Sequence, residues 1–221
     1  QGKARLLAAN KEIGSEAGEI LFTDDGLSGP PILQLAHLVS ELLPAATSGS
    51  NQAAKIAAEL PQLTLLLDFM PEFTEEEVFS LLTEFMPTNS NLTLAEILNG
   101  LLPKRVGASI VKETLSRPAA EPAASLTKAE RRQLASAVKG LPVNVTGTRG
   151  FPFAQVPAGG IATADFRPDT LESKLVPGLY AAGEILDIDG DCGGFNLQWA
   201  WASGVLAATR AAAALLEDIN Q

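Results

Sequence analysis

The residues best suited to chemistry lie near the end of the chain, in two glycine-rich segments ahead of a long apolar stretch. The first segment places Gly183 and Glu184 directly after a short apolar run at 179–182, which predicts a strand. The second places Gly193 and Gly194 at the expected start of a helix. Adjacent glycines let a ligand approach the backbone, and the first turn of a helix presents unpaired amides and a positive dipole end. This order of elements predicts a binding edge for an anionic or electron-rich group.

Side chains within these segments refine that prediction. Glu184, at the carboxyl end of the expected strand, is placed to accept hydrogen bonds from sugar or ribityl hydroxyls, although a solvated loop acid has the same pattern. Asn196 is expected to cap the helix. The body of the helix is expected to dock against a core through one stripe of small and apolar residues. The stripe consists of Leu197, Ala200, Trp201, Gly204, Val205, Ala208, Ala211, Ala212 and Leu215.

The alternating acids Asp187, Asp189 and Asp191 invite comparison with a calcium-binding loop. Counted from Asp187, the sixth position holds Cys192 and the twelfth holds Gln198, where such a loop needs Gly and Glu. The sequence therefore predicts no metal site.

Composition limits the partners. The 221 residues carry a formal net charge of −10 and no basic cluster, which argues against nucleic acid and anionic membrane surfaces. The single cysteine, Cys192, cannot form an internal disulfide and is expected to behave as a small loop or buried residue, which fits a cytoplasmic protein. Only residues 197–216 are long enough to cross a membrane, and Arg210 together with many alanines disfavours that.

The first part of the chain has a strand pattern. Residues 4–9 and 19–22 are apolar and are expected to form two strands around a polar turn at 11–18. A helix is expected to open at Pro30, after a cap at Ser28 or Gly29, and to contain a structural His37. A loop is expected at 44–52 and a further strand at 62–69.

Residues 70–140 have a helical pattern and are expected to form an insertion between strands. Capping boxes at Thr74/Glu77 and Thr127/Glu130 predict two helix starts, and two more helices are expected at 92–102 and 104–115. The strands that flank the insertion, at 62–69 and 142–146, are expected to pair with each other. Residues 151–156 are expected to form another partner of the 142–146 strand, through a turn at 147–150.

Four segments resemble one family. They are residues 171–201, residues 18–23 with 26–30, residues 67–71 and residues 102–105. They resemble a bacterial FAD flavoprotein family that includes NAD(FAD)-utilising dehydrogenases, aminoacetone oxidase-like proteins and BaiN/RdsA-like proteins. The sequence departs from the family pattern at Asp24 and Asp25, where a histidine or aromatic residue is expected.

The resemblance implies an α+β fold. A β-rich middle domain at 1–69 and 141–158 would carry the helical insertion at 70–140, and residues 159–221 would form the C-terminal strand–loop–helix of a Rossmann-like FAD domain. The family's N-terminal half carries a Gly-x-Gly-x-x-Gly loop for the FAD pyrophosphate, and no such motif follows a strand anywhere in this sequence. The resemblance thus implies a chain that begins inside the middle domain.

The resemblance also implies how FAD would be contacted. Gly183 and Glu184 would meet its ribityl or pyrophosphate part, while the segment 193–197 and the pair Gly159-Gly160 would lie near the isoalloxazine ring. Hydride chemistry belongs to the cofactor, so no catalytic side chain is assigned. The implied cofactor-binding residues are Gly159, Gly160, Gly183, Glu184, Gly193, Gly194, Phe195, Asn196 and Leu197.

The sequence thus predicts part of an FAD-dependent oxidoreductase linked to NAD(P)H or oxygen, acting on a small molecule. A non-catalytic binding module that keeps the fold is the alternative. A third interpretation is a subunit that binds FAD only beside a separate nucleotide-binding half. Alone, the chain is expected to bind FAD weakly or not at all, because the loop that holds most of the dinucleotide charge is missing.

Overall fold

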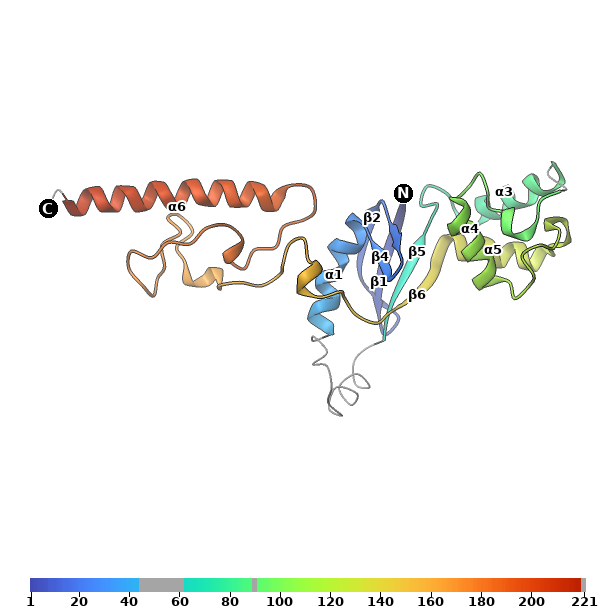
Figure 1. Cartoon of the computed structure of the whole chain (residues 1–221), viewed down its shortest axis with the longest axis horizontal. Coiled ribbons are helices and arrows are strands. Elements are labelled where there is room, and N and C mark those ends of the chain that lie inside the picture. The colour runs from blue at the N-terminus through green and yellow to red at the C-terminus, as the bar shows by residue number, and fades with distance from the viewer. Residues whose placement is uncertain (44–61, 89–90, 220–221) are drawn as a thin grey trace, which may run out of the picture. The chain divides into compact units, whose positions relative to one another are not determined.

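The computed structural model describes residues 1–43, 62–88 and 91–219. These divide into two compact units, Gln1–Gly147 and Thr148–Gln221, which are taken separately below. The coloured ribbon in Figure 1 runs through unit 1 in blue to yellow and through unit 2 in orange to red. The loop expected at 44–52 lies outside the described residues.

Unit 1 is built on a four-stranded antiparallel sheet. Its strands are β1 (Gly2–Ala8), β2 (Lys11–Gly18), β5 (Leu63–Asp68) and β6 (Leu141–Val145), in the order β2-β1-β5-β6. The pairing of β5 with β6 confirms that the strands flanking the helical segment meet each other. Alternate residues of β1 and β5 share one buried face, as a half-buried sheet requires.

Helix α1 (Pro30–Leu42) covers the buried face of this sheet. It starts at Pro30 directly after Gly29, as predicted, because Pro suits the first helical position. A two-stranded hairpin, β3 (Leu21–Thr23) with β4 (Gly26–Ser28), leads into it. The core below α1 contains Ala4, Leu6, Leu35, Val39, Leu63, Leu65 and Leu67.

Helices α3 (Glu75–Thr88), α4 (Lys104–Thr114) and α5 (Lys128–Gly140) form a second core, which also belongs to unit 1. Phe69 and Leu141 lie at the ends of β5 and β6 and pack against both cores. The helical core contains Val78, Leu82, Leu94, Ile97, Leu98, Ile110, Leu134 and Val138 among its most buried members.

An ion pair ties the sheet to the helices. Lys139 Nζ lies 2.7 Å from Asp68 Oδ2, with both side chains largely buried, and also donates to the Met70 carbonyl at 2.7 Å. Asp68 Oδ1 accepts from the Met70 amide at 3.0 Å. The buried charges of Asp68, at the end of β5, and Lys139, on α5, therefore compensate each other. An unpaired buried charge would be strongly destabilising.

Three Thr-x-x-Glu capping boxes start the helical segments. The two predicted boxes, Thr74/Glu77 and Thr127/Glu130, are confirmed by reciprocal hydrogen bonds between side chain and backbone. A third, Thr93/Glu96, opens a single 3-10 turn, Leu94–Glu96. Each box satisfies amides that the first turn would leave unpaired.

The three capping boxes predict that the helical segment of unit 1 loses stability at acidic pH. Hydrogen bonds from the Thr127 amide and hydroxyl, and then from Arg117, lower the pKa of Glu130 from 4.5 to about 2, and the same type of threonine contact lowers the pKa of Glu77 and Glu96. A depressed folded pKa means that this stabilisation is complete above about pH 4.5 and is lost as pH falls toward about 2. Thermal unfolding across that window should show falling stability, with a shallower fall in Glu130→Gln. Equal slopes in the two proteins would contradict this.

Two expectations for the N-terminal strands are wrong. The polar stretch at 11–18 is the strand β2, and the turn lies earlier, at Ala9 and Asn10, whose φ values of 47° and 66° are those of a tight hairpin turn. β2 is an edge strand, so its polar residues face water and its sequence lacks a clear apolar pattern. The second expected strand, at 19–22, is β3 (Leu21–Thr23), and among the described residues it pairs with β4 and not with the first strand.

Two further elements differ from expectation. Residues 92–102 contain only the Leu94–Glu96 turn, and Gly100, with φ of 92°, lies where a longer helix would have to continue. Residues 151–156 are not a strand partner of β6: Phe151–Phe153 forms one 3-10 turn around Pro152. Proline lacks the amide that such a strand would donate.

Unit 2 contains little regular structure besides α6 (Phe195–Ile219). The strand expected at 179–182 is reduced to one antiparallel bridge between Glu172 and Tyr180. No described segment continues that pairing, so the apolar run stays a loop. The core of the unit consists of Phe166, Leu171, Leu186 and Ala207, with Tyr180, Ala181, Ala182, Trp199 and Leu206 partly buried against it.

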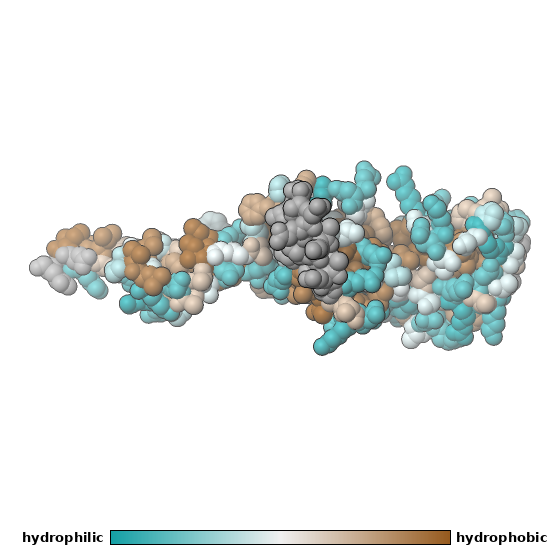
Figure 2. All heavy atoms as spheres, turned by 90° about the horizontal axis from the view of Figure 1, so that it is seen from below, coloured by the Kyte–Doolittle hydropathy of each residue, from teal (hydrophilic) through white to brown (hydrophobic). Residues whose placement is uncertain are grey.

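Helix α6 docks through a different face from the predicted stripe. Trp199, Ser203 and Ala207, at helical spacing, turn toward the core of unit 2. In contrast, Trp201 is 72% exposed and Val205 is 65% exposed. The stripe expected to be buried is thus largely at the surface. Figure 2 shows brown apolar patches on the unit that contains α6.

Candidate functional site

The Gly183–Glu184 corner is fixed to α6 through its backbone. The Gly183 amide donates to Ser203 Oγ at 2.9 Å, and the Gly183 carbonyl accepts from Trp199 Nε1 at 3.1 Å. Ser203 Oγ in turn donates to the Trp199 carbonyl at 2.6 Å. Gly183 has φ of 72° and opens the short turn Gly183–Ile185, which leaves the Glu184 side chain exposed.

The acidic loop before α6 is held at Gly190. Asn196 Oδ1 accepts from the Gly190 amide and Asn196 Nδ2 donates to the Gly190 carbonyl, each at 2.9 Å. The prediction that Asn196 caps α6 is therefore wrong, because its amide is used on the loop. Asn196 lies inside α6, which begins at Phe195, and the carbonyl of the preceding Gly194 accepts from the Gln198 amide at 3.0 Å.

The glycines of the candidate site differ in the structural reason that favours glycine over a residue with a side chain. A Cβ at Gly160 would lie 2.7 Å from the Ile185 carbonyl oxygen, because residue 161 pairs with residues 185–187. Gly194, with φ of 93°, and Gly159, with φ of 94°, would place a Cβ in open space. Packing therefore explains Gly160, while at Gly159 and Gly194 the positive φ favours glycine and no neighbour among the described residues fills the space of a side chain.

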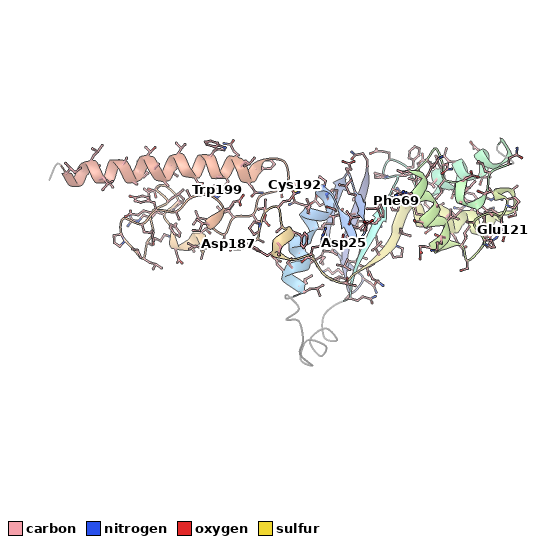
Figure 3. The ribbon with its side chains drawn as sticks, in the orientation of Figure 1. Asp25, Phe69, Glu121, Asp187, Cys192 and Trp199 are labelled. Carbon is pink, nitrogen blue, oxygen red and sulfur yellow. The ribbon has the colours of Figure 1, made fainter. Side chains whose placement is uncertain are left out.

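Hydrogen bonds connect these segments in pairs, two of them to the first turns of α6. Residue 161 bridges to residue 186, Gly183 is held by Trp199 and Ser203, and Gly190 is held by Asn196. Figure 3 shows Asp187, Cys192 and Trp199 in this part of unit 2. Of the predicted site residues, Gly160 thus lies beside 185–187, Gly183 beside α6, and Asn196 beside Gly190. The others adjoin these residues in the chain: Gly159, Glu184, Gly193, Gly194, Phe195 and Leu197.

The gathered surface is exposed and apolar at the helix start. Phe195 and Leu197 are 62% and 66% exposed, and Gly193 and Gly194 are exposed. The first amides of a helix have no intrahelical acceptors, so the surface combines amide donors with a flat apolar rim. Such an edge suits a planar, electron-rich ring better than a highly charged phosphate, since Glu184 and three aspartates lie nearby in the chain.

Metal binding receives no support among the described residues, where no group of three or more His, Cys, Asp or Glu side chains is arranged to hold a metal ion. Cys192 is exposed in the loop. Sequence reasoning missed Ser203 and gave Trp199 no role at the site. The available signal was the helical spacing of Asn196, Trp199 and Ser203, which places three hydrogen-bonding side chains on one face.

By length and composition, one described helix segment, Phe195–Glu217, could cross a membrane. That property alone is weak evidence, because docked helices share it. Here Trp199, Ser203 and Ala207 pack on the unit's own core, and Arg210 lies within the segment.

Comparison with known protein families identifies the family to which this chain belongs. Residues 2–156 match the family model for the HI0933-like protein barrel and H2TH domain. The chain therefore belongs to the HI0933-like family, as its sequence motifs indicated.

Three curated relatives add detail. The chain is 34% identical over 210 residues to a 3-dehydro-bile acid delta(4,6)-reductase of Clostridium scindens, covering 95% of this chain and 48% of the relative. Ribosomal RNA dihydrouridine synthases of Haemophilus influenzae and Escherichia coli are 29% and 32% identical, with 86% and 83% of this chain covered. Their own lengths are covered to 41% and 40%, so the chain spans about half the length of the relatives it matches or somewhat less.

Proposed function

We propose that this chain is part of an FAD-dependent oxidoreductase and supplies the edge on which the isoalloxazine ring rests. The observation that carries the proposal is Gly194, a glycine with φ of 93° at the start of α6 and open space where a Cβ would be. A ring lying over that position would use the space and accept from the helix amides. The residues present therefore fit a flavin.

Each segment has a role in this proposal. The amides at 193–197 would bind and orient the ring, and the positive end of α6 would stabilise negative charge on it. Glu184 would accept hydrogen bonds from ribityl hydroxyls, and Gly159 would let the ring approach a neighbouring loop. When bound, FAD supplies the hydride-transfer chemistry.

The substrate class follows from what the relatives' names share. A delta(4,6)-reductase and a dihydrouridine synthase both saturate a carbon–carbon double bond. We expect the same reaction here, in which a hydride that originates from NAD(P)H and a proton add across the double bond. The alternative is an oxygen-linked flavoprotein, in which the substrate is oxidised and oxygen accepts the electrons. The acidic balance of the chain, −10 without a basic cluster, favours a small molecule in the cytoplasm over RNA.

The domain organisation stays part of this proposal. A β-rich domain at 1–69 and 141–158 would carry the helical insertion at 70–140, and residues 159–221 would complete the FAD domain. The exposed apolar side of α6, including Trp201 and Val205, favours a second candidate in which this chain acts beside a nucleotide-binding half. A non-catalytic module would leave the same surface without flavin.

The proposal predicts that the isolated 221 residues bind FAD only weakly, because no glycine-rich dinucleotide loop is present in them to hold the pyrophosphate. Calorimetric titration with FAD should give a Kd above the micromolar range. The protein made from its whole reading frame should instead purify yellow and oxidise NAD(P)H in the presence of an enone. A colourless complete protein would overturn the oxidoreductase function, and tight binding by the 221 residues would overturn the division of roles.

A further inference from the structure

We infer that Asn196, Trp199 and Ser203 are positioning residues that set the spacing of the two glycine corners facing the flavin. They follow one another at i, i+3 and i+7, so they share one face of α6. Each uses its polar group to bond the backbone of Gly183 or Gly190. The inference rests on the proposed function, and none of the three acts on the flavin by side chain.

Ser203 is the central member. Its side chain is buried, with 1% of the residue exposed, and its hydroxyl has one hydrogen and two lone pairs. The hydrogen is donated to the Trp199 carbonyl, and a lone pair accepts from the Gly183 amide. Both functions of the hydroxyl are thus used, which explains a buried serine in an apolar helix face.

Trp199 completes the hold on Gly183. Its indole Nε1 donates to the Gly183 carbonyl, so both backbone groups of that glycine are bonded to α6. Gly183 is the first residue of a short turn and has φ of 72°, a conformation that glycine adopts without steric cost. The corner that carries Glu184 is therefore located by the helix and not by a strand.

Asn196 does the same for the second corner. Its side-chain amide bonds both the amide and the carbonyl of Gly190, which closes the acidic loop just ahead of Gly193 and Gly194. One rigid helix therefore positions both corners. A ligand that touches Glu184 at one end and the 193–197 amides at the other meets a fixed separation, and preorganisation of this kind lowers the cost of binding.

The test compares Ser203→Ala with Ser40→Ala. The Ser40 hydroxyl donates to the Ala36 carbonyl in the same i−4 pattern, but at an exposed position of α1. Hydrogen–deuterium exchange of the complete protein should show the Gly183 amide exchanging about ten-fold faster or more in Ser203→Ala, and unchanged in Ser40→Ala. Flavin release per folded protein should accelerate by a similar factor, with a shifted visible absorption spectrum. Trp199→Phe, which keeps an aromatic ring, should reproduce both effects where Ser203→Ala folds poorly.

The possible outcomes distinguish the positioning role of the three α6 residues from the proposed flavoprotein function. Unchanged exchange at Gly183 overturns the hydrogen-bonded hold. Faster exchange with wild-type flavin release and spectrum overturns the positioning role while leaving the flavoprotein proposal standing. A wild-type complete protein that carries no flavin overturns the proposed function, and with it the ligand for which the corners would be positioned.

Discussion

In the protein made from the whole reading frame, Gly194→Val is expected to preserve the fold and to abolish the retention of flavin. A Cβ at this position would meet no atom within 4 Å outside its chain neighbours, so the first side-chain carbon of valine has room among the described residues. The φ of 93° is unfavourable for a side chain and should cost about 1–3 kcal/mol, which a folded unit can tolerate. The branched side chain would occupy the space that we propose for the isoalloxazine ring. Flavin absorbance per folded protein, with circular dichroism to count the folded fraction, measures the effect.

Gly178→Val is the matched control. Gly178 has φ of 78°, and a Cβ there would also lie in open space, but this glycine belongs to the loop at 171–180 and not to the start of α6. The variant should carry the same backbone strain and keep its flavin. If both variants retain the wild-type ratio of flavin to folded protein, Gly193 and Gly194 serve only the helix start, and their cofactor assignment fails.

Gly29→Ala should have the largest effect on stability, because no side chain fits at this position. A Cβ there would lie 2.1 Å from the Glu19 carbonyl oxygen, and φ is 98°. Overpacking and backbone strain together should cost about 3–5 kcal/mol, enough to unfold a marginally stable unit. Chemical denaturation followed by far-ultraviolet circular dichroism should show a much lower midpoint for unit 1.

Gly26→Ala separates the two contributions. Gly26 lies in the same hairpin region with φ of 153°, but a Cβ there would meet nothing within 4 Å. We expect strain without clash, and hence a loss of about 1 kcal/mol. Equal destabilisation by the two alanines would show that backbone conformation, and not contact with Glu19, is what requires Gly29.

Local signals allowed much of unit 1 to be predicted. The Thr/Glu boxes at 74–77 and 127–130 and the Gly29-Pro30 start act within four residues, so they can be identified directly in the sequence. The pairing of β5 with β6 was also predictable, since each is a bounded β-rich segment on one side of a helical stretch.

Features that depend on distant partners were missed. β2 is polar because it lies at a sheet edge, and its strand state comes from pairing with β1. The face of α6 that is buried depends on where the core of unit 2 lies, and composition alone pointed to the small residues on another side. Ser203 meets Gly183 across twenty residues of chain, so helical spacing could group Ser203 with Asn196 and Trp199 but could not identify Gly183 as its partner.

The contact of Trp199 with Gly183 has a spectroscopic consequence. The chain has two tryptophans, Trp199 and Trp201, both in the first turns of α6. Tryptophan fluorescence of the chain therefore reports on the start of α6. Unfolding of unit 1 has to be followed by a backbone signal such as far-ultraviolet circular dichroism. The Trp199 indole is hydrogen-bonded and partly buried, whereas Trp201 is 72% exposed, so the two should differ in emission maximum. A flavin bound nearby would quench both by energy transfer.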